Sequence, residues 1–205
     1  MVVVALSSVV AVVWARHAAL GAVDELRATG PVWADGCRAG DLRVSGCAGA
    51  LVVWATTAHT EPVFVPLAWA TMFFSLVDLD THSIPTVHVR TLTVVTFALV
   101  AGTSPWTGAS PSNMAIGAVV ATVATKVVEI ASRGDLGSGD VALAPIVGLH
   151  AGWTAWSGAL SALATAFLLS GAVAALGVVT GRLRVRSHVA LAPFLFAGTW
   201  ISVLR

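Results

Sequence analysis

The sequence predicts an all-α protein that crosses a membrane about eight times, with some of the helices short and the amino terminus outside. Of the 205 residues, 57% are hydrophobic and only 10% are charged, whereas an ordinary soluble domain is about 25% charged. Apolar stretches recur along the whole chain between short polar breaks. The basic residues are concentrated in alternate polar breaks, and this pattern predicts which ends of the helices face the cytoplasm. The composition excludes both a soluble globular enzyme and a disordered chain.

Eight apolar stretches form membrane helices in this prediction, each extended by flanking Thr, Ser and Gly residues. The first is expected to be a retained helix and not a signal peptide, because no positively charged segment precedes it. One or two of the shorter stretches can instead be re-entrant or merge with a neighbour. The eight stretches are Val2–Val23, Val44–Ala58, Val63–Val77, Val87–Gly102, Ala115–Ile130, Val141–Trp153, Gly158–Val179 and Val189–Leu204.

The basic residues predict which loops face the cytoplasm. With eight spans and the amino terminus outside, ten of the 11 Lys and Arg residues lie in, or at the helix ends next to, loops on one side, and only Arg205 lies on the other. Basic residues accumulate in cytoplasmic loops, so that side is expected to be the cytoplasm. The expected aromatic belt at the outer ends consists of Trp54, Trp106, Trp153, Trp156 and Trp200. Residues 1–205 are thus predicted to form a single membrane domain with the lipid bilayer around it.

The composition also excludes several kinds of partner and cofactor. A net charge of +1 gives no basic surface for nucleic acid, so no nucleic-acid partner is expected. Cys37 and Cys47 cannot form a four-ligand zinc site by themselves, and the six histidines are scattered. The phosphate-binding pattern Gly-x4-Gly-Lys-Ser/Thr is absent from the sequence. We therefore expect neither a metal nor a cofactor.

Acidic residues at membrane depth are costly and therefore indicate function. Most of the ten acids lie in predicted loops, where water solvates them, and Glu129 is three residues after Lys126, so these two are expected to form a structural ion pair. The remaining acids are Asp78, Asp80 and Asp140. Asp78 and Asp80 are two residues apart at the end of the third helix, where they point in different directions, so only one of them is expected to be catalytic.

The sequence around these acids shapes the backbone. After Asp78, Pro85 interrupts the helix, because the residue before proline avoids the α region. In Gly137-Ser138-Gly139-Asp140, the glycines allow a positive φ or the close approach of another helix. Asp140 could also be an ordinary N-cap of the sixth helix. Two aspartates on different helices at one depth suit an aspartyl hydrolase, in which an ionised carboxylate activates water and a protonated one donates to the carbonyl.

These two segments resemble the paired signatures of the type IV prepilin peptidase family, which are membrane aspartyl proteases of the GxGD type. The resemblance covers residues 68–205 and includes the segments Gly148–Trp153 and Ala192–Gly198. It implies that Asp78 and Asp140 are the catalytic pair. By the same resemblance, Gly137 and Gly139 are supporting motif residues with Pro85, and Asp80 is an accessory acid.

Two departures from the family pattern are visible. Ala142 stands where the family commonly has a lysine, two residues after the second aspartate. The first cytoplasmic loop is short and has only Cys37 and Cys47 in place of paired Cys-x-x-Cys motifs. The chain therefore resembles a short form, in which N-methyltransferase activity is expected to be absent.

The resemblance implies an endopeptidase that removes the basic leader of type IV prepilin-like or pseudopilin-like precursors at the cytoplasmic side of a bacterial inner membrane. Such precursors are the implied protein partners, and the oligomeric state stays open. One alternative is a small transporter or channel subunit in which Asp78 and Asp140 bind a cation or relay protons. Another is a homologue that binds precursors without cutting them, as Ala142 suggests. His82 and His88 are expected to be solvated.

Overall fold

A computed structural model describes residues 64–81, 84, 86–133, 136–153, 155–183 and 189–204. Every element in these residues is an α-helix, and no strand occurs among them, as the sequence predicts. The first two predicted helices, Val2–Val23 and Val44–Ala58, lie outside the described residues. The helices are α3 (Phe64–Thr81), α4 (Thr86–Thr107), α5 (Pro111–Ala131), α6 (Ser138–Ala151), α7 (Gly158–Val179) and α8 (Ala192–Val203).

The helix boundaries follow local signals. α7 has the predicted bounds, and α5 begins at Pro111 because the Ser110 hydroxyl accepts a hydrogen bond from the Asn113 amide at 3.4 Å. α6 begins at Ser138, three residues before the predicted start, since the extended backbone of Gly137 (φ −64°, ψ 142°) serves as its N-cap. Ser138 and Gly139, which precede the predicted helix, are therefore the first two residues of α6.

The chain divides into two compact units, residues 1–85 and 86–205, which are described separately. In the first unit, α3 has buried side chains on several sides, including Phe73, Phe74 and Val77. The rings of Phe73 and Phe74 meet edge to face with their centroids 5.0 Å apart. A helix that is apolar all round belongs in an interior or in a membrane.

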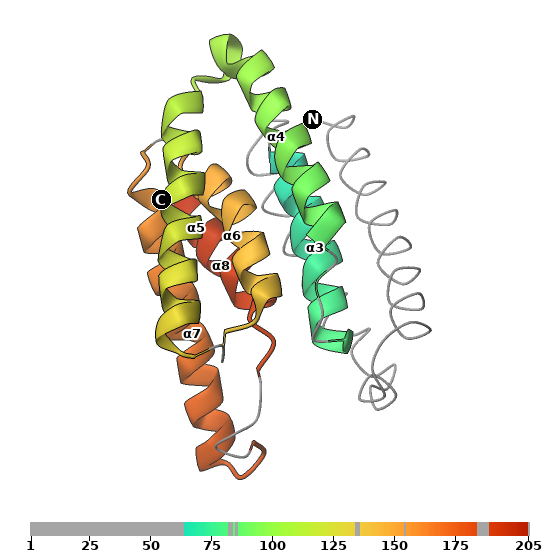
Figure 1. Ribbon diagram of the computed structural model, residues 1–205, viewed down its shortest axis with the longest axis vertical. Coiled ribbons are helices and arrows are strands. Elements are labelled where there is room, and N and C mark those ends of the chain that lie inside the picture. Colours follow the sequence, from blue (N-terminus) through green and yellow to red (C-terminus); the bar gives the residue numbers. More distant parts are fainter. Residues whose placement is uncertain are drawn as a thin grey trace. The chain divides into compact units, whose positions relative to one another are not determined.

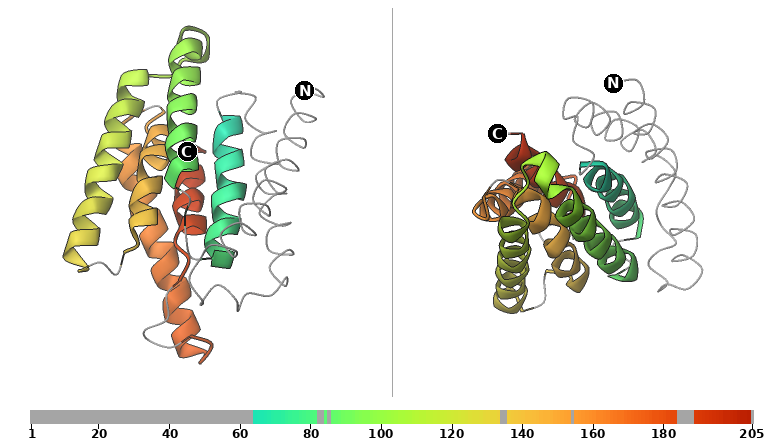
Figure 2. Two further views of the ribbon diagram at one scale, coloured as in Figure 1. Left: turned by 45° about the vertical axis from the view of Figure 1, so that its right-hand side comes forward. Right: turned by 90° about the horizontal axis from the view of Figure 1, so that it is seen from above.

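In the second unit, α6 is the central helix. It packs against α4, α5, α7 and α8 (Figures 1 and 2). From Leu143 to Ala151 every side chain except that of Pro145 is buried. α6 is also short, with 14 residues against 21 in α5 and 22 in α7.

Small residues bring α5 and α6 into close contact. The buried residues of α5 are Met114, Gly117, Ala121 and Thr125, spaced three or four apart, so they form one stripe. A Cβ added to Gly117 would lie 2.5 Å from the carbonyl oxygen of Gly148. Backbones can approach this closely only where side chains are absent, and such contacts hold helices together when the surroundings are as apolar as the helices themselves.

A small residue also allows α8 to pack closely against α7. A Cβ on Gly198 of α8 would lie 3.0 Å from the amide nitrogen of Ala166. Next to this contact, the Ser202 hydroxyl donates to the carbonyl oxygen of Gly158 at 3.1 Å and shares a hydrogen bond with the Ser161 hydroxyl. Only the first half of α7 is buried in this way, whereas Val173, Leu176 and Val179 in its second half are exposed.

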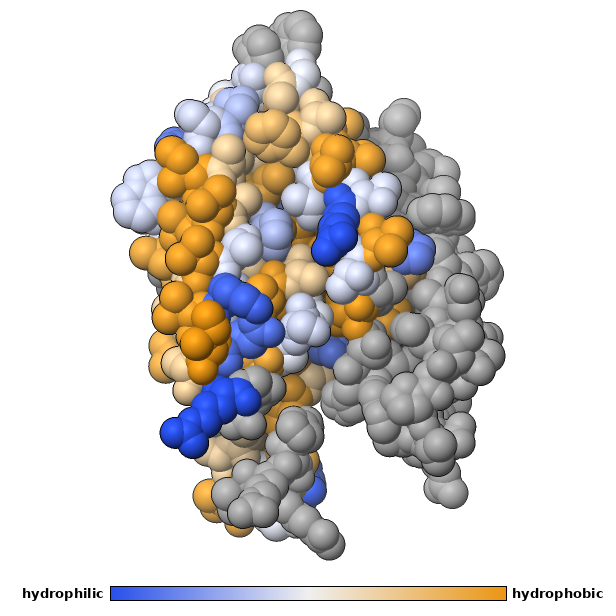
Figure 3. Space-filling view, viewed as in Figure 1, coloured by the Kyte–Doolittle hydropathy of each residue, from blue (hydrophilic) through white to orange (hydrophobic). Residues whose placement is uncertain are grey.

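Two of the described helices, α5 and α7, are long and apolar enough to cross a membrane by length and composition. Shorter apolar helical stretches cover Pro66–Leu79, Thr86–Gly102 and Ala192–Val203. Figure 3 shows apolar side chains gathered along α5. The exposed apolar residues of α5 are Ile116, Val119, Val123, Val127, Val128 and Ile130. A face of this kind suits contact with lipid tails.

We predict that Gly148→Ala weakens the second unit. The added Cβ would lie 2.7 Å from the Ala121 Cβ and closer still to the Gly117 backbone, so α5 and α6 must separate. Overpacking of this kind costs about 1–3 kcal/mol, measurable as a lower midpoint of thermal unfolding in detergent. Gly171→Ala is the matched control, because no atom lies within 4 Å of the added Cβ. Equal midpoints for the two variants would contradict the close contact.

Candidate active site

Asp78 and Asp80 lie within α3, because this helix continues to Thr81 and not only to the predicted end at Val77. Asp78 is buried, with 5% of its surface exposed. Two helical positions differ by about 200° around the axis, so Asp80 starts on a different side of α3. Ile84 is outside any helix, in agreement with the predicted break, and Pro85 itself lies outside the described residues.

Asp140 lies in the first turn of α6, as the third helical residue. Its amide donates a hydrogen bond to the carbonyl oxygen of Gly137 at 3.0 Å. The alternative that Asp140 is the N-cap is therefore wrong, because that position belongs to Gly137 and has no side-chain cap. An acidic residue in a first turn is stabilised by the positive end of the helix dipole. The side chain is half-buried.

The two glycines before Asp140 have different roles. A Cβ on Gly137 would lie 3.3 Å from Oδ2 of Asp140, so this carboxylate lies back over the N-cap and leaves little room there. Gly139 is inside α6 and has a helical backbone. The prediction that it could have a positive φ is therefore wrong, and the described glycines with positive φ are Gly108 and Gly181. The error follows from the earlier start of α6.

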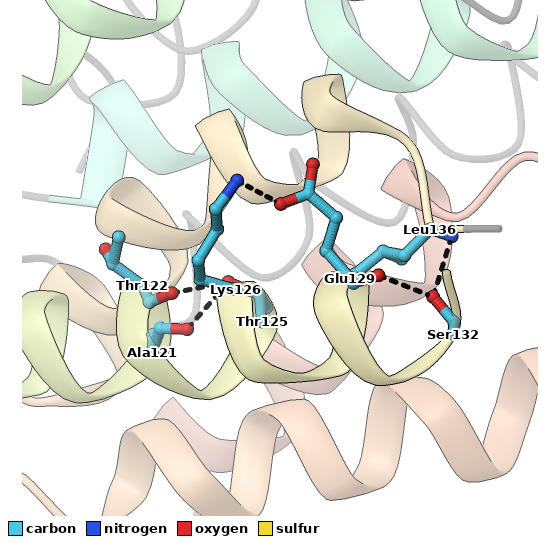
Figure 4. Close-up of polar contacts among 7 residues, drawn as sticks. All are labelled: Ala121, Thr122, Thr125, Lys126, Glu129, Ser132 and Leu136. Carbon is cyan, nitrogen blue, oxygen red and sulfur yellow. Dashed lines mark hydrogen bonds and ion pairs between the residues drawn. The ribbon is translucent and has the colours of Figure 1, made fainter. Parts of the chain in front are cut away.

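Ser132 connects the end of α5 to the loop before α6. Its hydroxyl donates to the carbonyl oxygen of Glu129 at 3.1 Å and accepts a hydrogen bond from the amide of Leu136 at 3.3 Å (Figure 4). The next residue, Arg133, has a φ of 57°, a left-handed conformation that favours glycine. These two hydrogen bonds tie Leu136, the residue before Gly137, to the end of α5.

Lys126 and Glu129 form the predicted ion pair on α5 (Figure 4). The Lys126 side chain is 57% exposed, whereas that of Glu129 is only 16% exposed. A helical ion pair three residues apart, with its lysine exposed to solvent, contributes about 0.2–0.5 kcal/mol to a helix. Its energetic role in folding is therefore small.

His150 is a buried polar residue whose position the sequence analysis did not single out. It lies near the end of α6 with no exposed surface, and its Nδ1 atom shares a hydrogen bond with the carbonyl oxygen of Ile146 at 2.8 Å. Its place in a predicted membrane helix was the available signal, because ionisable residues there are rare. The described residues contain no group of three or more His, Cys, Asp or Glu side chains able to hold a metal.

Each aspartate is thus held by a helix next to a polar connection: Asp78 in the last turns of α3, and Asp140 in the first turn of α6. Carboxyl groups held in this way can take up or release a proton and can activate a water molecule. Such chemistry is typical of a hydrolase that needs no metal.

Comparison with known families agrees with a helical hydrolase. The model of the type IV leader peptidase family matches residues 64–201, and the chain belongs to this family. At the level of the family it is a peptidase. The matched range includes α3 with Asp78 and α6 with Asp140. No curated protein and no solved structure matches the chain.

We predict that Gly137→Val lowers peptidase activity on the order of tenfold. The first added carbon already lies 3.3 Å from Oδ2 of Asp140, so the branched side chain displaces this carboxylate. A small misplacement of a reacting group can be this costly. Cleavage of a leader-bearing precursor is measured at matched membrane levels of enzyme. Ser138→Ala, at an exposed position of the same turn, should keep normal activity. A Gly137→Val variant as active as Ser138→Ala would contradict the role of this glycine.

Proposed function

We propose that this protein is an aspartyl endopeptidase that removes the leader peptide from type IV prepilin-like or pseudopilin-like precursors. The observation that carries the proposal is the family match over both α3 and α6, which contain Asp78 and Asp140. Each of these residues is placed by its helix at the edge of an apolar segment. The Gly137-Ser138-Gly139-Asp140 motif before the second aspartate also supports it.

In the proposed mechanism the two aspartates divide acid and base work. The positive end of the α6 dipole stabilises a negative charge in its first turn. We therefore assign the ionised carboxylate to Asp140, which takes a proton from the attacking water. Asp78 is the protonated partner and donates to the oxygen of the scissile carbonyl. As the tetrahedral intermediate collapses, a proton passes to the leaving amine and the carboxyl groups return to their starting states.

The proposed location is a bacterial inner membrane, with the reaction at the cytoplasmic side. Two described helices, α5 and α7, have the length and composition of membrane spans. Eight spans with the amino terminus outside would place ten of the 11 basic residues on the cytoplasmic side. A precursor anchored by its own apolar helix would present its leader at that surface, where cleavage after a glycine releases the leader.

Ala142 supports a second candidate, a homologue that binds precursors without cutting them. It lies two residues after Asp140 in α6 and supplies no charge to the first turns of this helix. The same cleavage assay separates the two candidates, because only a peptidase converts a precursor to its mature form.

We predict that Asp78→Asn and Asp140→Asn each abolish processing, because the two carboxyl groups act as one unit. Cleavage of a co-expressed precursor with a lysine-rich leader is read from its change in size. Asp80→Asn should keep most of the activity, since this residue starts on a different side of α3. An equal loss in Asp80→Asn would contradict the assignment of Asp78 as the catalytic acid of α3.

A second prediction concerns topology. Cysteines placed beside Arg133 and Arg184, in a variant without Cys37 and Cys47, should react only with reagents that enter the cytoplasm. Cysteines at Trp106 and Trp156 should react with a reagent that cannot cross the membrane. Labelling of the Arg133 position from the outside would reject the proposed orientation, while leaving the fold of the second unit unaffected.

A further inference from the structure

The structure provides a register between α5 and α6 that locates the Lys126 and Glu129 pair. A Cβ on Gly148 would lie 2.7 Å from the Ala121 Cβ, and a Cβ on Gly152 would lie 2.8 Å from the Asn113 carbonyl oxygen. Residue numbers therefore fall along α5 as they rise along α6, and the two helices run antiparallel.

Gly148 meets the turn of α5 between Gly117 and Ala121, so this register places Asp140 at the level of the turn between Thr125 and Glu129. Glu129 is eight residues after Ala121, and Asp140 is eight residues before Gly148. Eight residues of helix correspond to about 12 Å, so both acids lie the same distance from the contact between Ala121 and Gly148. Glu129 also continues the buried stripe of α5, because it is four residues after Thr125.

The side chains of the pair agree with this placement. In Figure 4, Lys126 and Glu129 both project from the side of α5 on which the chain passes through Leu136 into α6. The Glu129 side chain is only 16% exposed, whereas an acid on the outer surface of a helix would be largely solvated. The bond from the Ser132 hydroxyl to the Glu129 carbonyl oxygen further ties this turn to the loop before α6.

We propose that Lys126 is a positioning residue of the active site, which neutralises Glu129 and so prevents a second negative charge from acting on Asp140. This inference rests on the proposed peptidase function. Without Lys126, the Glu129 carboxylate would oppose the ionised form of Asp140, the form that activates water. The pair therefore keeps a polar element near the level of Asp140, the proposed general base, while adding no net charge.

The charge effect is tested by cleavage of a precursor that has a lysine-rich leader, a glycine and a long apolar helix, with the full-length enzyme in membranes. Lys126→Met should lower kcat on the order of tenfold and leave KM nearly unchanged. Lys126→Arg should retain activity, because it keeps the charge. The double variant Lys126→Met with Glu129→Gln should recover most of the loss, because it removes the opposing charge.

Arg90→Met is the matched control, since it removes an exposed basic residue from α4 and should leave cleavage unchanged. Normal activity of Lys126→Met would overturn the inference. It would also be overturned if the double variant were as slow as Lys126→Met, because the loss would then come from Lys126 itself and not from the unbalanced Glu129.

A second measurement is independent of activity. In a variant without Cys37 and Cys47, cysteines at positions 129 and 140 should be joined rapidly by a short bis-maleimide. Cysteines at 127 and 140 should not, because Val127 is exposed at nearly the same level on another side of α5. A wild-type enzyme that cuts no precursor would reject the proposed function. The cross-linking result does not depend on cleavage. If the cysteines at 129 and 140 did not cross-link, Glu129 would not lie near Asp140 and the inference would be overturned.

Discussion

The close approach of α5 and α6 is the contact on which the second unit depends. Gly117 and Gly148 remove the side chains that would hold these helices apart, and the backbones meet directly. A membrane supplies little hydrophobic driving force between helices, so packing of this kind has to provide the association. The same contact fixes the register of the two helices, and with it the level at which α6 begins and Asp140 is presented.

The positions of α3 to α8 could be predicted because long apolar runs between polar breaks have few other solutions in a membrane. The ends of these helices were harder to predict from the sequence. Gly137 and Ser138 were interpreted as a connection, whereas Gly137 caps α6 and Ser138 is its first residue. For this reason the alternative of Asp140 as a cap and the positive φ of Gly139 were both wrong. A helix start depends on backbone angles that neither glycine nor serine determines strongly.

The candidate site could likewise be predicted only in part. The Lys126 and Glu129 pair was predictable, because three-residue spacing on a helix brings side chains together. Its level relative to Asp140 was not, since that depends on which glycine of α6 meets α5. The catalytic roles of Asp78 and Asp140 remain predictions from the family pattern. His150 shows that a buried polar side chain can be hidden in a sequence when its neighbours are all apolar.

α6 is shorter than α7, and its length limits where its ends can lie in a membrane. The 14 residues of α6 span about 21 Å, whereas the 22 residues of α7 span about 33 Å, and the hydrocarbon layer is about 30 Å thick. A helix as short as α6 cannot reach both surfaces of that layer, so at least one of its ends lies at a depth where the free backbone groups need protein or water as hydrogen-bond partners.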